Sequence, residues 1–320
     1  MSLYPLQINP ALHVKVWGGR KLETLLGKHL PTAEPYGESW ELHDTATVAN
    51  GPHAGRSVGD LLKEYGHALV GSKNDPAEGF PLLAKILDPQ EWLSVQVHPN
   101  DEQARELEGD PRGKTEAWYV LNVEPGSKIV KAVQPGTTRA EMARAIRDNK
   151  LEKLLIYDEV VAGDVLLNNA GGIHALGPGV MIYEIQQSSD VTYRLYDWGR
   201  VDLNGQPREL HIDKGVTVAN LDTIPAVAHT AENTLPVVDV VQSPYFITLL
   251  HQLNPRNGTR ITLDTRGDQF HILTVIEGAA EVSAGDTAFT LKVGQTALIP
   301  ANQGVYTVSG TARILRSFQP

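Results

Sequence analysis

Short runs of strand-forming residues, separated by turn signals, constrain the fold of this chain more than any other feature. The runs are rich in Val, Ile, Leu, Thr and Tyr and recur over most of the 320 residues. They lie at residues 93–98, 117–123, 127–132, 164–168, 180–186, 245–254, 259–263, 271–277 and 288–291. Many short strands at such spacing are typical of a β-sandwich or β-barrel. The sequence therefore predicts a mainly β fold.

Helical patterns interrupt the strands at a few places. Residues 57–65 begin with a cap-like serine and carry apolar residues at helical spacing. Thr138 and Glu141 form a capping-box pattern in front of a further apolar repeat. Residues 99–108 and 151–155 also favour helix. We expect these helices to be insertions in a β framework.

Composition and charge exclude several classes of function. The chain has no cysteine, which excludes disulfides, thiolate metal sites and cysteine nucleophiles and fits a reducing cytosol. Its net charge is −10 without a block of like charges, which argues against nucleic acid or an anionic membrane as partner. No apolar run is long enough to span a bilayer, and we expect no signal peptide. We expect a cytoplasmic monomer or homodimer.

A composition shift marks the boundary between two predicted domains. Residues 224–236 contain two prolines and little periodicity, which is typical of a linker or a long connection. After this segment the sequence is almost entirely strand and turn. We therefore predict one domain at residues 1–239, which includes the helices, and a second at residues 240–320.

Two segments look like copies of a degenerate internal repeat. Residues 163–174 and 294–304 both follow the order glycine, strand, turn, strand. The first copy ends on His174, whereas the second has Val305 or Tyr306 at about that place. The second domain also lacks a Gln-x-His pair and a matching glutamate. We therefore predict that the second domain binds no metal and has a structural role.

A row of polar residues occupies one of the predicted strands. Ser94, Gln96 and His98 are spaced two apart, so their side chains point to the same face of a strand. Val95 and Val97 point to the opposite face, where they can be buried. The strand therefore presents a row of potential ligands on one side only.

Two further residues complete a possible metal site. Glu116 begins a second β-rich run, and His174 follows a glycine-rich turn. Together with His98 they supply two imidazoles and a carboxylate, the ligand set of catalytic zinc. The amide oxygen of Gln96 is a possible fourth ligand, although Gln96 is equally compatible with a hydrogen-bonding role beside the ligands. The sequence thus predicts a metal site with a position open for water or substrate.

The ordered motifs Gln-x-His-Pro, Lys-x-Glu, Gly-x-x-His-Ala and Tyr-Arg-x-x-Asp extend this pattern along the chain. They occur at residues 96–99, 114–116, 171–175 and 193–197. With Val16-Trp-Gly-Gly19, this set resembles the type I mannose-6-phosphate isomerases of the cupin superfamily, in their short bacterial form. The resemblance covers nearly the whole chain. It implies two cupin-like β-barrel or jelly-roll domains with a few inserted α-helices.

The resemblance also implies the metal ligands. They fall on His98, Glu116 and His174, with Gln96 as a further ligand in some members, and the implied cofactor is one zinc ion per chain. The sequence departs from the family at the turn before the last histidine, where Asn169 replaces a proline. The turn is then less rigid, but the ligand is still present.

The implied reaction is the interconversion of mannose 6-phosphate and fructose 6-phosphate through an enediolate. The family's active-site arginine falls on Arg194, which stays cationic and suits charge stabilisation or phosphate binding rather than proton abstraction. We count Lys114 with Arg194 as a catalytic residue. The general base is left open among Lys114, Glu41, His43 and Glu184.

The resemblance also implies substrate-binding residues, and two other classes of function remain as alternatives. Lys85 and Ser94 fall where the family is expected to hold the sugar phosphate. The rivals are another metal-dependent cupin enzyme, such as a dioxygenase or a different sugar isomerase, and a non-catalytic sugar-sensing cupin. A redox cupin would more often use a richer histidine set with iron or manganese. The presence of every ligand and of Arg194 favours the isomerase, with a small sugar phosphate as its partner.

Three tryptophans and most of the histidines are interpreted as structural residues outside the site. Trp17, Trp40 and Trp118 are predicted core residues rather than platforms for a sugar. Histidines that lack partners at ligand spacing are predicted to be ordinary. They are His13, His43, His53, His67, His211, His229, His251 and His271.

Overall fold

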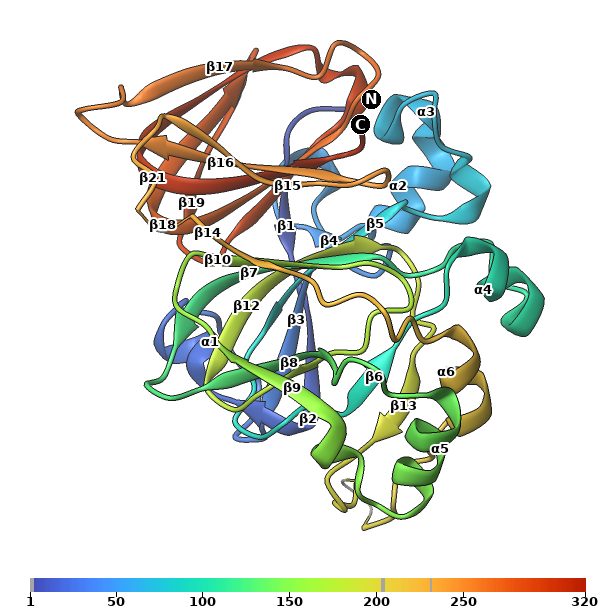
Figure 1. Cartoon of the computed structure of the whole chain (residues 1–320). Coiled ribbons are helices and arrows are strands. Elements are labelled where there is room, and N and C mark those ends of the chain that lie inside the picture. Colours follow the sequence, from blue (N-terminus) through green and yellow to red (C-terminus); the bar gives the residue numbers. More distant parts are fainter. Residues whose placement is uncertain (1–2, 203–204, 231) are drawn as a thin grey trace.

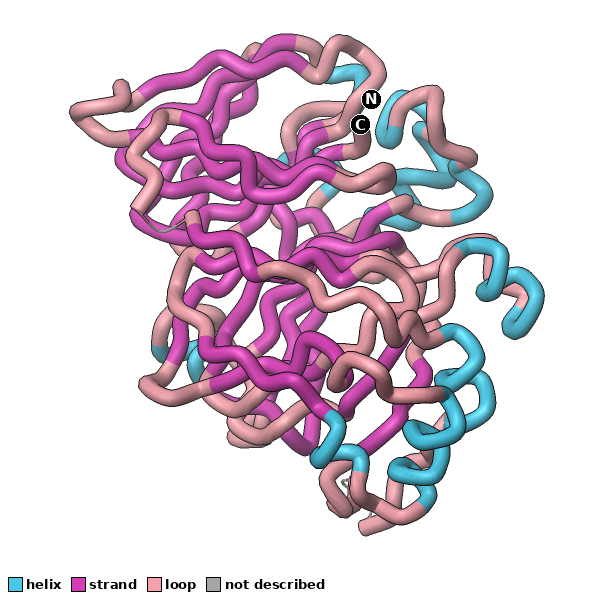
Figure 2. The backbone as a smooth tube through the Cα atoms, viewed as in Figure 1, coloured by secondary structure: helices cyan, strands magenta, loops and turns pink. Residues whose placement is uncertain are grey.

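Two stacked β-units make up the molecule (Figure 1). The structure, a computed structural model, describes residues 3–202, 205–230 and 232–320. Strands dominate both units, and the helices lie mostly along one side (Figure 2). The mainly β fold predicted from the spacing of the strand-forming runs is therefore confirmed.

A seven-stranded antiparallel sheet forms the centre of the first β-unit. Its strands, in spatial order, are β14 (Val227–His229), β10 (Asp164–Asn168), β7 (Glu116–Val123), β12 (Val180–Gln187), β5 (Leu82–Leu87), β3 (Tyr36–Leu42) and β2 (Ala11–Gly19). All residues of β5 and β12 are buried. Both faces of the sheet are therefore covered by other parts of the molecule.

A second group of short strands lies opposite this sheet, and the predicted metal ligands lie between the two. It consists of β11 (Ala175–Leu176), β8 (Lys128–Val133) and β9 (Leu155–Glu159) in one small sheet, and β13 (Tyr193–Tyr196) and β6 (Val95–Val97) in another. Reciprocal backbone hydrogen bonds between Gln96 and His174 join the two small sheets. Val95 and Val97 of β6 are fully buried, as the alternation in the sequence predicted.

The predicted helices are present and surround the framework. The helices of the described residues are α1 (Lys21–Thr24), α2 (Val58–Tyr65), α3 (His67–Val70), α4 (Asp101–Glu108), α5 (Arg139–Arg147) and α6 (Ile212–Val218). Ser57 caps α2, and Thr138 and Glu141 form both bonds of the capping box at α5. Residues 151–155, expected to be helical, form only a 3₁₀ turn (η3, Leu151–Leu154) before β9 begins. None of these helices has the length and apolar character needed to cross a membrane.

The C-terminal β-unit is built on a nine-stranded sheet. Its strands are β15 (Val237–Gln242), β16 (Ile247–Leu253), β21 (Val305–Phe318), β18 (His271–Ala284), β20 (Thr296–Ile299), β1 (Leu6–Asn9) and β4 (Thr47–Val48), with β17 (Arg260–Asp264) on β21 and β19 (Thr287–Lys292) on β18. The two longest strands, β18 and β21, each span 14 residues. Apolar side chains from β16 to β21 pack together, so the sheet encloses its own core.

The two units share one buried apolar cluster, and the C-terminal unit contains strands from outside its own predicted segment of the chain. β1 and β4 come from the start of the chain but pair within the C-terminal sheet. Residues 224–236, expected to be a linker, contribute β14 to the seven-stranded sheet instead, because Val227–His229 pairs with β10. The domain boundary after residue 239 stays a prediction.

Candidate active site

Three of the predicted ligands meet in the first β-unit. The ligating atoms of His98, Glu116 and His174 lie within 4.8 Å of one another. His98 Nε2 is 3.4 Å from Glu116 Oε2, and His174 Nε2 is 3.1 Å from Glu116 Oε1. The three residues are at most 2% exposed. Residues from β7, from the end of β6 and from the glycine-rich turn before β11 thus form one compact cluster.

The hydrogen bonds of this cluster fit a divalent metal. His98 Nδ1 lies 2.9 Å from the carbonyl of Val191, and His174 Nδ1 lies 3.0 Å from the carbonyl of Gly172. Because a carbonyl only accepts, each Nδ1–H donates, and each Nε2 keeps its lone pair for a ligand. Nε2 of His98 is buried without a hydrogen bond, and the oxygens of Glu116 are buried with only the Lys114 ammonium and the two imidazoles facing them. A bound cation would satisfy the imidazole lone pairs and the carboxylate together.

Gln96 lies directly beside the cluster. Its side-chain amide nitrogen is 3.2 Å from His174 Nε2, the nitrogen that also faces Glu116. As a metal ligand Gln96 would present its oxygen, which a 180° turn of the amide brings to the same place. Its role as a ligand stays a prediction, but its position is the one that this role requires.

Lys114 controls the charge of the cluster. Its Nζ is 2.9 Å from Glu116 Oε2, and both side chains are almost completely buried. Burial alone would raise the pKa of Glu116, but Lys114 and His174 hold that pKa well below its usual range. Burial and the Lys114 charge lower the pKa of His98 to about 3. An ionised carboxylate and a neutral imidazole are the forms that bind metal.

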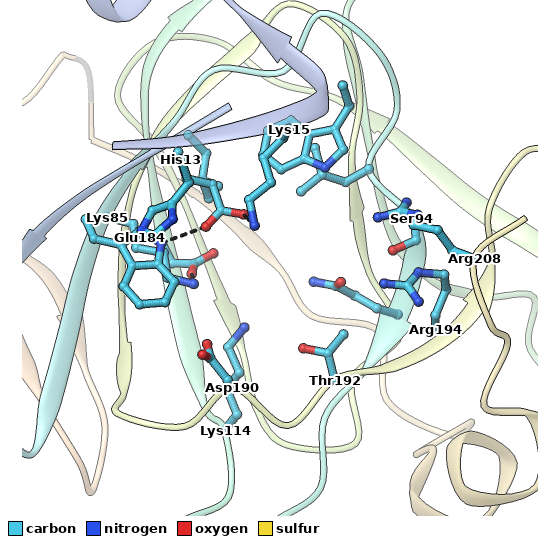
Figure 3. Close-up of a pocket in the computed structure, with 16 residues that line it drawn as sticks. His13, Lys15, Lys85, Ser94, Lys114, Glu184, Asp190, Thr192, Arg194 and Arg208 are labelled. Carbon is cyan, nitrogen blue, oxygen red and sulfur yellow. Dashed lines mark hydrogen bonds and ion pairs between the residues drawn. The ribbon is translucent and has the colours of Figure 1, made fainter. Parts of the chain in front are cut away.

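A cavity of about 450 Å³ opens beside the His–Glu–His cluster, and Figure 3 shows the side chains that line it. It reaches the cluster through Gln96 and Lys114. Its remaining walls come from both layers of strands and from the segments between them. They are formed by His13, Lys15, Trp17, Glu38, Trp40, Lys85, Leu87, Leu93, Ser94, Glu184, Asp190, Thr192, Arg194 and Arg208.

One wall of the cavity is part of a row of side chains from four neighbouring strands. Trp40, Lys85, Glu184 and Trp118 are cross-strand partners on β3, β5, β12 and β7, and the first three line the cavity. Trp118 Nε1 donates to Glu184 Oε2 at 3.0 Å, and Lys85 Nζ lies 3.7 Å from Glu184 Oε1. Burial and the charge of Glu116 raise the pKa of Glu184 against the opposing effect of Lys114. The row therefore holds an oriented carboxylate that faces the cavity.

The opposite side of the cavity carries arginines (Figure 3). Arg194 pairs with Gln96 across β13 and β6 and donates from Nη1 to the carbonyl of Glu209 at 3.0 Å. Arg208 is held by the carboxylate of Asp197, with Nε 2.7 Å from Oδ2. Burial and the nearby Arg208 charge lower the pKa of Arg194. Two guanidinium groups beside Ser94 make this side suited to an anion.

The structure places all eight predicted site residues at this one location. His98, Glu116 and His174 form the cluster, Gln96 and Lys114 contact it, and Lys85, Ser94 and Arg194 line the cavity. Glu41, considered as a base, instead faces the C-terminal β-unit. There it accepts a hydrogen bond from Thr296 at 3.1 Å and pairs with Lys28 at 2.8 Å.

Sequence reasoning missed part of the cavity wall. His13 and Glu38 line the cavity and were not singled out as site residues. The missed signal was the same alternation that identified Ser94 and Gln96, because His13, Lys15 and Trp17 are also spaced two apart. Trp40 was predicted to be a core residue but lines the cavity with its ring under the Lys85 ammonium, 5.0 Å from the centroid. Arg208 and Asp190 lie on segments outside the strands and gave no such signal.

A cupin-like pair of β-units, with a buried His–Glu–His cluster beside an ionic cavity, defines a candidate metalloenzyme of the cupin class. Residues 5–124 match the family model described as "Phosphomannose isomerase type I, catalytic domain". Residues 238–319 match the model described as "Mannose-6-phosphate isomerase, cupin domain". The chain belongs to the type I phosphomannose isomerase family, as the resemblance in its sequence indicated.

Individual relatives are similar to this chain over its whole length. The "Putative mannose-6-phosphate isomerase YvyI" of Bacillus subtilis is 33% identical over 99% of each chain. The mannose-6-phosphate isomerase of Streptococcus mutans is 33% identical over 98% of each. The crystal structure of the mannose 6-phosphate isomerase from Bacillus subtilis superimposes with a TM-score of 0.88 at 32% identity, covering 98% of this chain and 99% of that one.

Proposed function

We propose that this protein interconverts mannose 6-phosphate and fructose 6-phosphate. The observation that carries the proposal is one cavity that lies beside the His–Glu–His cluster. The cavity contains the oriented carboxylate of Glu184 and, opposite that carboxylate, the pair Arg194 and Arg208. An aldose–ketose isomerisation of a sugar phosphate needs a stabiliser of oxyanion charge, a proton carrier and a phosphate site. The family to which the chain belongs supports the same reaction.

We propose one zinc ion per chain, held by His98, Glu116 and His174, with Gln96 as a further ligand. Two imidazoles and a carboxylate match the ligands of catalytic zinc, and such sites keep a position open. When bound, the ion supplies Lewis-acid stabilisation of negative charge on the substrate oxygens.

The proton transfer is assigned to Glu184. Isomerisation moves one hydrogen from C2 to C1 and one hydroxyl proton from O2 to O1. The Glu184 carboxylate faces the cavity, and Trp118 and Lys85 orient it, so it would accept the carbon-bound proton and return it to the neighbouring carbon. Lys114 is held as an ammonium by Glu116, so it would donate a hydrogen bond to a substrate oxygen rather than act as a base.

The phosphate group is assigned to the arginine side of the cavity. Arg194, Arg208 and Ser94 together offer guanidinium and hydroxyl donors to an oxyanion. Lys85, expected from the sequence to bind phosphate, lies on the other side of the cavity beside Glu184 (Figure 3). We therefore propose that Lys85 orients Glu184 and that Ser94 contacts the phosphate. The protein would act in the cytoplasm as a monomer or homodimer.

Formation of fructose 6-phosphate from mannose 6-phosphate tests the proposal. Purified protein should produce it, lose this activity with a chelator and recover it when zinc is restored. Glu184→Gln should lose most turnover, whereas Glu277→Gln, a change of an exposed carboxylate in the C-terminal β-unit, should not. A zinc-loaded protein that leaves mannose 6-phosphate unchanged would refute the function. Full turnover by Glu184→Gln would refute only the assignment of the base.

A further inference from the structure

The C-terminal β-unit has a polar cluster inside its apolar core. The cluster consists of His251 on β16, His271 on β18, and Tyr306 and Arg316 on β21. The first three are at most 3% exposed. Arg316 is the cross-strand partner of leucines on both neighbouring strands, β16 and β18. Residues two apart share a face of a strand, so the cluster lies on the face that encloses the core.

A hydrogen bond connects two of these residues. His271 Nδ1 is 2.7 Å from the Tyr306 hydroxyl. Arg316 acts electrostatically on both His271 and Tyr306. The remaining donors of the cluster are the guanidinium of Arg316 and the two imidazoles.

Other donors of the cluster have no partner. His251 is 3% exposed, yet both of its ring nitrogens are buried without a hydrogen bond. Nε of Arg316 is also buried without a partner, and its guanidinium carbon lies 4.8 Å from the centroid of the Phe318 ring. Unpaired buried polar groups are unfavourable and are rare in folded proteins, so each calls for an explanation.

The charges that act on the two histidines of the cluster are positive. Within the described parts of the chain, no carboxylate is among the groups that shift the pKa of His251, His271 or Arg316. The charges that act on the two histidines come instead from Arg316 and, at His271, also from Arg266 and His251. Such a cluster repels a metal cation, although the protein as a whole has a net charge of −10.

We propose that this cluster is a binding site for a small oxyanion, either inorganic phosphate or the phosphate group of a small metabolite. Arg316 would supply a charged donor, and the two imidazoles and Tyr306 would supply the neighbouring hydrogen bonds. The site is separate from the active-site cavity, because none of its residues lines that cavity. The second β-unit would thus be a ligand-binding unit as well as a structural support.

Thermal unfolding in the presence of inorganic phosphate tests the site. The parent protein should be Arg194→Ala/Arg208→Ala, so that the active site contributes little to phosphate binding. Its melting temperature should rise with phosphate along a one-site curve. Adding Arg316→Gln should weaken phosphate binding roughly 10- to 100-fold, the range expected for one charged hydrogen bond. Arg260→Gln, on exposed β17, is the matched control and should bind as the parent does.

Three further measurements keep the test decisive. If Arg316→Gln fails to fold, Tyr306→Phe and His251→Gln should each still weaken phosphate binding several-fold with an unchanged circular dichroism spectrum. Mannose 6-phosphate should bind the parent protein as phosphate does if the site accepts phosphate monoesters, and only inorganic phosphate should bind if it does not. An equal effect of chloride at matched ionic strength, or equal binding by Arg316→Gln and Arg260→Gln, would overturn the proposal.

Discussion

In the first β-unit a carboxylate, Glu116, lies between His98 and His174, whereas in the C-terminal unit two buried histidines share their surroundings with Arg316 and Tyr306. Both pairs of imidazoles are buried in the interior of a β-unit. The charge beside them differs, and we assign a cation to the first and an oxyanion to the second. A shared architecture thus fixes where side chains point, while their neighbours decide what they bind.

The two copies of the predicted internal repeat end on different residues. The first copy ends on His174, and the second has Val305 and Tyr306 at about that position. Val305 is 61% exposed, whereas Tyr306 is buried and bonds to His271. The second copy thus has a phenol hydroxyl where the first has a histidine. That the C-terminal domain binds no metal stays a prediction.

Replacing the shared carboxylate should have the largest effect. Glu116→Gln removes the negative charge between the two imidazoles, so we expect zinc to be lost. Loss of several kcal/mol of Lewis-acid stabilisation corresponds to roughly a 1000-fold fall in turnover. Metal analysis and the isomerase assay on the same sample would check both effects. A variant that retains zinc and most activity would show that Glu116 is not the centre of the site.

Removing the positive charge of Arg194 should have the second-largest effect on turnover. Arg194→Ala should keep the fold and the metal while turnover falls on the order of 100- to 1000-fold, the range for one preorganised donor. Arg194→Lys should recover little, because an ammonium lacks the planar fork. A rise confined to KM for mannose 6-phosphate would make Arg194 a phosphate anchor. Activity within a few-fold of wild type would make it structural.

The contrast between the units should also appear in the dependence of stability on pH. Burial and the Arg316 charge lower the pKa of His251 from 6.5 to about 4. Because the folded-state pKa is the lower one, protons bind the unfolded chain first. The contribution of neutral His251 to the free energy of unfolding is fully present above pH 6.5. It is lost as the pH falls toward 4, by on the order of 3 kcal/mol.

His251→Gln should therefore flatten this acid dependence. The stability of the wild type relative to the variant should decrease between pH 7 and pH 4.5 when both are unfolded with urea. Phosphate should oppose the loss, because a bound oxyanion favours the protonated imidazole. Parallel curves for the two proteins would show that His251 does not titrate as its surroundings imply.

A change in the interior of the C-terminal unit should have the smallest effect on turnover. Arg316→Gln should leave turnover of mannose 6-phosphate within about two-fold of wild type, because Arg316 is absent from the active-site cavity. Steady-state assays with zinc at saturation would measure this. A loss of more than ten-fold in a folded Arg316→Gln protein would mean that the C-terminal interior acts on the active site.

Much of the fold could be predicted from local patterns. The alternation around Val95 and Val97 identified β6, and the capping box of Thr138 identified α5, because both signals depend on neighbouring residues. The pairing of β1 with β20 could not be predicted, since it joins residues about 290 positions apart. The strand inside residues 224–236 was missed because it has only three residues.

The His–Glu–His cluster was more predictable than the rest of the site. Its ligand types are chemically distinctive, so His98, Glu116 and His174 were identifiable from the sequence alone. Arg208 and Asp190 reach the cavity from irregular segments, where no periodicity indicates direction. The polar cluster of His251 and His271 was interpreted as ordinary, because its meaning depends on the absence of a nearby carboxylate, a tertiary property.

Anomalous diffraction from crystals of the zinc-loaded protein would test the difference between the two units most directly. Data collected on both sides of the zinc absorption edge locate zinc without assumptions about its ligands. We expect one peak per chain, between His98, Glu116 and His174, and no peak near His251 and His271. A zinc peak in the C-terminal interior, or an active protein without zinc at the His–Glu–His cluster, would contradict the assignment of a cation to the first unit alone.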